Sequence, residues 1–205
     1  MCRRRNASPY RRPRNRVKGN EQRMKPINNY TGTGFPTSAG IFLGLGMGGF
    51  FDGIILHQVL QWHHMVTSAG YPADSVANLQ FNTLLDGLFH ATTYIFVAIG
   101  LGLLWRAARQ RHEHWSSKML IGALLIGFGS FNLIEGIIDH QLLGLHHVNE
   151  TAPPAQWIYW DLGFLAWGAF MVVGGWLLLR MGKQETAGVA TQQSGETRER
   201  EGSVA

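Results

Sequence analysis

Cysteine is almost absent from this sequence, and charge is scarce over most of its length. The 205 residues include one cysteine, Cys2, which excludes an internal disulfide framework and a zinc site built from cysteines. Only 15% of the residues are charged, whereas 45% are apolar. Soluble domains carry about 25% charged residues. The chain therefore combines unlike parts, and the positions of its few charges separate them.

The lysines and arginines are confined to three regions. Ten of the 18 lie within residues 1–38, four lie at 106–118 and four follow from residue 180 onward. Residues 1–38 and 181–205 are otherwise mostly polar or small, so they bury too little apolar surface to offset the entropy cost of ordering. The sequence predicts two disordered tails. Because a basic tail is not a basic folded surface, we expect no nucleic-acid partner.

Four long apolar segments lie between the tails, at about 39–62, 81–105, 119–143 and 157–179. Each has the roughly 20 residues that a helix needs to cross a hydrocarbon core of about 30 Å. The sequence therefore predicts an all-α integral membrane protein embedded in a lipid bilayer, with a domain over residues 39–180. Short connections favour an up-down-up-down four-helix bundle.

The loops predict the orientation of the chain. The connections near 63–80 and 144–156 contain no lysine or arginine, whereas both tails and the 106–118 connection do. By the positive-inside rule, the N- and C-termini are cytoplasmic and the two uncharged connections face outward. We expect a multi-pass protein of the cytoplasmic membrane, with the basic tail attracted to anionic lipid.

One motif occurs twice. Residues 52–64 align without a gap on residues 135–147, at an offset of 83. The shared pattern is an acid, Gly, Ile, Ile, one variable residue, His, Gln, a variable residue, Leu, two variable residues and His-His. Two leucine-rich helices share aliphatic residues by chance, but not five polar positions in register. The sequence predicts two tandem helical hairpin repeats with the same orientation in the membrane.

Acids and histidines gather toward the outer half of the spans. An ionisable group in hydrocarbon costs about 2.5–3.5 kcal/mol or more, so these groups need partners, water or a metal. On an α-helix, His57 and His64 share one stripe, whereas Asp52 and His57 point roughly 140° apart. Asp52 and His63 share a face, about 16 Å apart along the axis.

These positions divide into two predicted sets. The predicted metal ligands are the deeper or paired residues His57, His64, His90, His140, His147 and Asp86. The predicted residues for orienting ligands or handling protons are Asp52, Glu135, His63, His146, Asp139 and Asp161. Imidazole with carboxylate suits zinc, oxidised copper, iron or manganese, and the lack of thiols argues against a soft site. Paired histidines such as His57 and His140 are also compatible with haem b.

Four functions stay open at this point. The leading one is a transition-metal centre for metal handling or a redox role. A haem-binding electron-transfer protein and a proton or ion pathway are alternatives, although the inner halves of the spans lack ionisable residues. A structural protein that binds a membrane partner or a second copy of itself is the fourth. Hydrolase motifs such as Gly-x-Ser-x-Gly are missing, and enzymatic activity is undecided.

The polar segments resemble a known family. These are the stretch from Phe51 through His57 to Met65, the stretch Asp86-Gly87-Leu88-Phe89-His90-Ala91, and the stretch from Phe131 through Glu135 to Val148. They look like the bacterial family of predicted membrane proteins called domain of unknown function 2243, over about residues 39–180. The resemblance implies a four-span membrane protein, and it supplies no catalytic residue.

Overall fold

The computed structural model describes residues 35–110 and 115–203, and within them every regular element is a helix. The predicted all-α class is confirmed. Most of the predicted tail at 1–38 lies outside the described residues. The elements are α1 (Thr37–Phe50), η1 (Phe51–Val59), α2 (Val76–Gln110), α3 (Ser117–Glu135), η2 (Gly136–Leu142), η3 (Pro154–Gln156) and α4 (Trp157–Ser203). Here η1 and η2 are π-helices and η3 is one turn of 3₁₀-helix.

Four stretches of helix are long and apolar enough to cross a membrane, as predicted. They are Thr37–Val59, Val76–Arg109, Ser117–Leu142 and Pro154–Val189. The second and fourth extend well beyond the predicted 81–105 and 157–179. The first and third end in their π-helical segments, at Val59 and Leu142, slightly before the predicted ends at 62 and 143.

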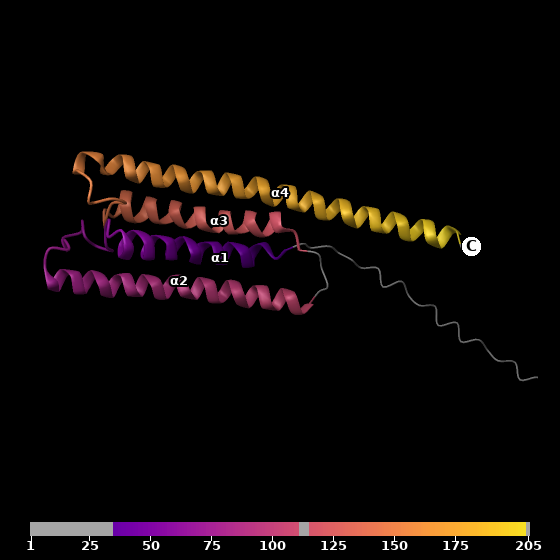
Figure 1. Cartoon of the computed structure of the whole chain (residues 1–205), viewed down its shortest axis with the longest axis horizontal. Helices are drawn as coiled ribbons and strands as arrows, with labels where there is room; N and C mark the ends of the chain where they lie inside the picture. The colour runs from indigo at the N-terminus through magenta and orange to yellow at the C-terminus, as the bar shows by residue number, and fades with distance from the viewer. Residues whose placement is uncertain (1–34, 111–114, 204–205) are drawn as a thin grey trace, which may run out of the picture. The chain divides into compact units, whose positions relative to one another are not determined.

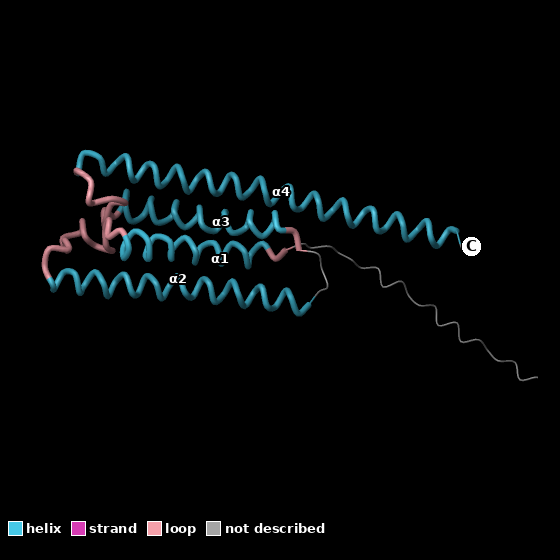
Figure 2. The backbone as a smooth tube through the Cα atoms, viewed as in Figure 1, coloured by secondary structure: helices cyan, strands magenta, loops and turns pink. Residues whose placement is uncertain are grey.

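Helices α1 and α3 form a central pair. Helix α2 packs on α1 and helix α4 packs on α3, so that α2 and α4 lie on opposite sides of the pair (Figure 1). Consecutive helices run in opposite directions. As a result, the loops at 60–75 and 143–153 meet at one end, next to both π-helices (Figure 2). We call this end the loop end.

Glycines allow α1 and α3 to approach closely. A Cβ atom built on Gly44 would lie 2.9 Å from the Cα atom of Gly127, and one built on Gly127 would lie 2.9 Å from the Cα atom of Gly44. Both would also press on backbone atoms of the facing helix. Close backbone approach at small residues is how membrane helices associate without a hydrophobic driving force.

Positions 83 residues apart share their local geometry. Each π-helix is followed by a turn in which the amides of Leu60 and Leu143 donate to the carbonyls of Ile55 and Ile138, both at 2.8 Å. The next residues in the chain, Gln61 and Gly144, have φ angles of 50° and 59°. These left-handed residues terminate the helices and turn the chain back.

Helix α4 continues to Ser203, whereas the sequence predicted a disordered tail over 181–205. No proline follows Pro154, and the segment contains the helix formers Ala, Glu, Gln and Arg, so the helix continues despite four glycines that each cost about 1 kcal/mol. An ion pair between Lys118 and Glu185 joins the extension to the start of α3.

Candidate functional site

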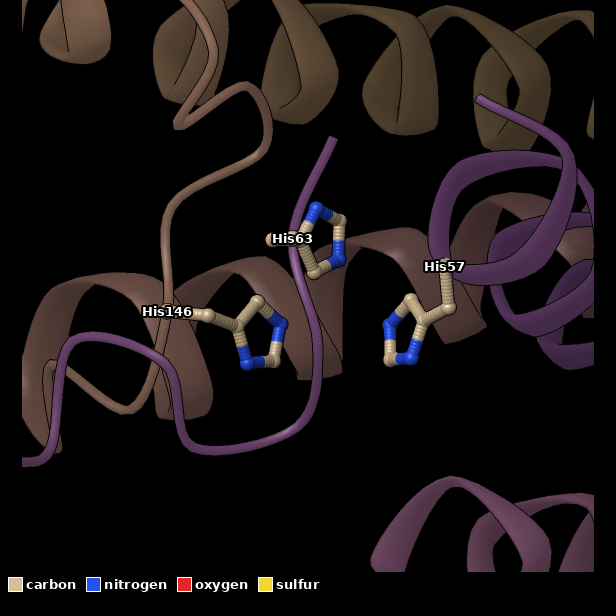
Figure 3. Close-up of side chains that lie close together, drawn as sticks. All are labelled: His57, His63 and His146. Carbon is tan, nitrogen blue, oxygen red and sulfur yellow. The ribbon is translucent and has the colours of Figure 1, made fainter. Parts of the chain in front are cut away.

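Six buried polar residues come together at the loop end, three from each half of the chain. Each is at most 6% exposed. We call them the inner cluster: Asp52, His57, His63, Glu135, His140 and His146. Figure 3 shows three of its imidazoles, with His57 on η1 and His63 and His146 on the two loops, grouped around a common space.

The π-helices create the acid and histidine pairs. A carboxylate oxygen of Asp52 lies 2.9 Å from His57 Nε2, and Glu135 lies 3.1 Å from His140 Nε2. Because the hydrogen bonds of a π-helix join residues five apart, residues i and i+5 share one face. The prediction that Asp52 and His57 point apart assumed an α-helix, and it is wrong for this reason.

The chain reversal after each π-helix brings in a second histidine. His63 Nε2 lies 3.8 Å from Asp52 Oδ1, and His146 Nε2 lies 3.2 Å from Glu135 Oε1. The expected separation of about 16 Å between Asp52 and His63 assumed that the helix continued. The helix instead ends at Val59, and the loop folds back over the acid.

Backbone carbonyls from the opposite loop orient these two loop histidines. His63 Nδ1 donates to the Val148 carbonyl at 2.8 Å, and His146 Nδ1 donates to the Met65 carbonyl at 3.0 Å. The two rings stack with their centroids 4.4 Å apart. With each Nδ1 engaged in this way, both Nε2 atoms face the inner cluster, an arrangement typical of metal-ligating histidines.

Burial and neighbouring charges set the two histidines apart. Burial and the neighbouring His146 and His57 hold the pKa of His63 well below its usual range, so His63 is neutral. Burial also lowers the pKa of His146, but the hydrogen bond to Glu135 and its charge outweigh burial and leave that pKa raised. The neutral His63 therefore has a lone pair on Nε2 that is available to a ligand.

A carboxylate on α2 supports the first half of the inner cluster. Asp86 Oδ1 accepts from His57 Nδ1 at 2.9 Å, and its Oδ2 accepts from His64 Nδ1 at 2.8 Å. The amide of Met65 also donates to Asp86, at 3.1 Å. Asp86 therefore holds the ring of His57 with Nε2 toward the inner cluster, and it ties the loop to α2.

A carboxylate on α4 has the same place in the second half. Asp161 Oδ2 accepts from His147 Nδ1 at 2.7 Å, and its Oδ1 accepts from the Val148 amide at 3.0 Å. His140 Nδ1 lies 3.7 Å from the same carboxylate. Asp86, Asp161, His64 and His147 form what we call the outer layer, in which His64 and His147 are partly exposed.

The atoms of the inner cluster converge, and the contacts among them leave several polar atoms without a hydrogen bond. Ligand atoms lie within 4.8 Å of one another in three groups: His57, His63 and His146; Glu135, His140 and His146; Asp52, His63 and Glu135. Four buried polar atoms of the inner cluster form no hydrogen bond: Asp52 Oδ1, His63 Nε2, Glu135 Oε2 and His140 Nδ1. Buried polar atoms in native proteins are normally satisfied, so this concentration points to a bound species.

The structure sorts the predicted residues by position. His57 and His140, which the sequence predicts as ligands, lie in the inner cluster. So do four residues predicted for supporting roles, Asp52, Glu135, His63 and His146. The predicted ligands His64, His147 and Asp86 lie in the outer layer with Asp161.

Two predicted residues lie apart from both sets. His90, a predicted ligand, places its ring against Gly53 and stacks on Phe50. Asp139, predicted to support the site, belongs to none of the three groups of ligand atoms.

Sequence reasoning missed several contacts that shape the site. The carbonyls of Met65 and Val148 orient two histidines, yet a carbonyl leaves no trace in the residue type. Phe89 stacks on His57 with ring centroids 5.9 Å apart, and Phe164 packs on His140 at 5.4 Å. Each phenylalanine follows an outer-layer aspartate by three residues, a spacing that was visible in the sequence.

Comparison with known proteins places the chain in a family. No curated protein and no solved structure matches the chain. A family model described as "Predicted membrane protein (DUF2243)" matches residues 39–182, which is the helical domain with the inner cluster and the outer layer. The chain belongs to this family of predicted membrane proteins.

Proposed function

We propose that the inner cluster binds transition-metal ions and forms a resident metal centre in the membrane domain. The observation that carries this proposal is the convergence of buried imidazole and carboxylate groups whose ligand atoms lie within 4.8 Å of one another, together with the buried polar atoms of the inner cluster that form no hydrogen bond. Leaving such groups unsatisfied costs about 1–3 kcal/mol each, and a cation removes that cost for several groups at once.

The ligand chemistry favours zinc, iron, manganese or oxidised copper. All the ligand atoms of the inner cluster are imidazole nitrogens or carboxylate oxygens, a set that suits these ions and not a soft thiolate-bound metal. The Nδ1 atoms of His57, His63 and His146 donate to a carboxylate or a carbonyl. Such partners fix the ring orientation and raise the basicity of the coordinating nitrogen.

The paired arrangement favours two ions per chain, one for each half. Asp52, His57 and His63 come from the first half, and Glu135, His140 and His146 come from the second. Asp52 and Glu135 share one group of ligand atoms, so carboxylates lie where they can connect two ions. Glu135, His140 and His146 form one group of ligand atoms by themselves, whereas the first-half residues converge in groups that also include His146 or Glu135.

Two alternatives have less support. A bis-histidine haem held by His57 and His140 requires the macrocycle between these two imidazoles, whereas the ring of His63 packs on both, with centroids 4.4 Å from His57 and 6.2 Å from His140. A transmembrane ion pathway requires polar groups along the whole membrane. Beyond the cluster, α1 contains no ionisable residue, and α4 contains none between Asp161 and Arg180. A resident centre fits this one-sided placement better than a transmembrane pathway does.

Metal analysis of the detergent-purified protein tests the proposal. We expect about two equivalents of one transition metal in the wild type and a loss of most of it in the double variant His57→Ala/His140→Ala. His90→Ala is the matched control, because it removes an imidazole from the same region but from outside the inner cluster. Substoichiometric metal in wild type and double variant alike would refute the centre. An absorption spectrum of the same sample detects haem by its Soret band.

We further propose that the loop end faces outward and that both termini are cytoplasmic, in the cytoplasmic membrane. The support is the absence of lysine and arginine from residues 60–75 and 143–156. The single native cysteine simplifies the test, which uses the variant Cys2→Ser/Ala73→Cys. Exposed Ala73 lies in the first of these loops. A membrane-impermeant thiol reagent should label this variant in intact cells. Labelling only after lysis would mean that the loop end faces the cytoplasm.

A further inference from the structure

A pocket of about 330 Å³ opens at the loop end beside the inner cluster. Most of its wall comes from the first loop and the start of α2, and two residues come from the second loop. Its polar lining consists of Gln61, His63, His64, Thr67, Glu150 and Thr151. The pocket reaches the inner cluster at His63, which belongs to both.

The pocket and the inner cluster share His63. Its side chain is fully buried, and its Nε2 atom faces Asp52. The neighbouring pocket residue, His64, also reaches the cluster through one carboxylate, because Asp86 accepts from both His64 and His57. On one path, the imidazole of His63 lies between the pocket and the rest of the inner cluster. On the other path, the Asp86 carboxylate connects His64 to His57.

The charge around the pocket selects for cations. The two loops contain no lysine or arginine, whereas Glu150 lines the pocket. Glu150 Oε1 accepts from the Ser68 hydroxyl at 2.5 Å and from the His147 amide at 3.1 Å. These bonds hold the carboxylate in place across both loops. Imidazole, carboxylate and hydroxyl groups together suit a partly hydrated divalent transition-metal ion.

The two halves of the chain differ at this point. His64 lines the pocket, whereas its counterpart His147 packs on Trp157 with ring centroids 4.7 Å apart and is not part of the lining. Both histidines donate to an outer-layer aspartate in the same way. A comparison of His64 with His147 therefore distinguishes a role in the pocket from a role in supporting the inner cluster.

From these observations we propose that the pocket is the entry vestibule of the metal centre, where His64 and Glu150 capture a hydrated divalent cation before it passes His63. This inference rests on the proposed function of the inner cluster. It predicts a rate effect, because capture residues outside the centre accelerate loading without changing the final occupancy.

Stopped-flow loading of metal-free, detergent-purified protein with Zn²⁺ tests the vestibule, with a chromophoric chelator as competitor. We expect His64→Gln and Glu150→Gln each to slow loading about tenfold, which is within the range that local charge and capture exert on association rates. The final zinc content of Glu150→Gln should equal that of the wild type. His147→Gln and Asp74→Asn are the matched controls, and both should load at the wild-type rate.

The outcomes separate the two proposals. If the wild type binds zinc but all four variants load equally fast, the vestibule is refuted and the centre stands. Equal slowing by His64→Gln and His147→Gln also overturns the vestibule, because the effect then comes from support of the cluster. A wild type that binds no zinc and contains no other metal refutes the centre and the vestibule together.

Discussion

The substitution Gly127→Ala tests whether the close crossing of α1 and α3 holds the inner cluster together. A Cβ atom at this position would lie closest to the Ile41 carbonyl oxygen, and it would lie 2.8 Å from Leu45 N and 2.9 Å from Gly44 Cα. These are backbone atoms, so no side-chain rotation relieves the clash. Ordinary contact begins at 3.4 Å, and the helices must therefore separate locally by at least about 0.6 Å. Overpacking of this kind costs about 1–3 kcal/mol.

The same separation affects the inner cluster, because its two acids lie on opposite sides of this interface. Asp52 follows α1 and Glu135 ends α3. Functional constellations tolerate displacements of about 0.5 Å, so we expect the affinity for metal to fall together with stability. In the double variant Gly44→Ala/Gly127→Ala, the two losses should be less than additive, because one separation relieves both clashes.

Unfolding of the metal-free protein in mixed micelles, followed by circular dichroism during an SDS titration, measures the loss of stability. Gly163→Ala is the matched control, because a Cβ atom there meets no atom within 4 Å. This control should be neutral or more stable by up to about 1 kcal/mol, the usual gain from replacing a helical glycine. If Gly127→Ala is as stable as Gly163→Ala, the helices are not in close contact and the reasoning fails.

Three further predictions concern the site and its turns. Asp86→Asn should weaken metal binding about 10- to 100-fold in a competitive titration, because the substitution alters the partner that orients His57. An unchanged affinity would show that Asp86 has no such role. The pKa of His146 is raised by Glu135, which extends to higher pH the range in which a metal must displace a proton from this ring. Measured affinity should therefore increase with pH and decrease on acidification, and a flat profile would contradict the assignment of His146 as a ligand. Gly144→Ala should destabilise the protein by about 1–2 kcal/mol in the SDS titration, because a φ angle of 59° is unfavourable for a residue with a Cβ atom. A neutral result would mean that residue 144 is not left-handed.

The long apolar segments of the sequence were sufficient to predict the fold class. Four apolar runs of sufficient length predicted four membrane helices, and the structure has them. The prediction succeeded because the bilayer imposes one rule, that the backbone of every span must satisfy its own hydrogen bonds. The extent of α4 was not predicted, since a polar helix of good helix formers has no composition that distinguishes it from a coil.

The sequence also identified which residues gather, but it misplaced them within the site. The recurrence of acid, His and His-His at an offset of 83 selected Asp52, His57 and His63 together with their counterparts. Assigning roles among them required a helical geometry, and the α-helix was the default. Under that default His64, not His63, shared a stripe with His57.

Tertiary structure decided the site through two departures from the α-helix. The π-helical turn places Asp52 beside His57, because it aligns residues five apart instead of four. The left-handed residue Gln61 then ends the helix and returns His63 to the acid. Neither departure has a signal in the local sequence, because both depend on packing between halves of the chain that are 83 residues apart. Composition and pattern by themselves determined the membrane fold and the set of polar residues, whereas contacts between distant segments determined which of those residues face one another.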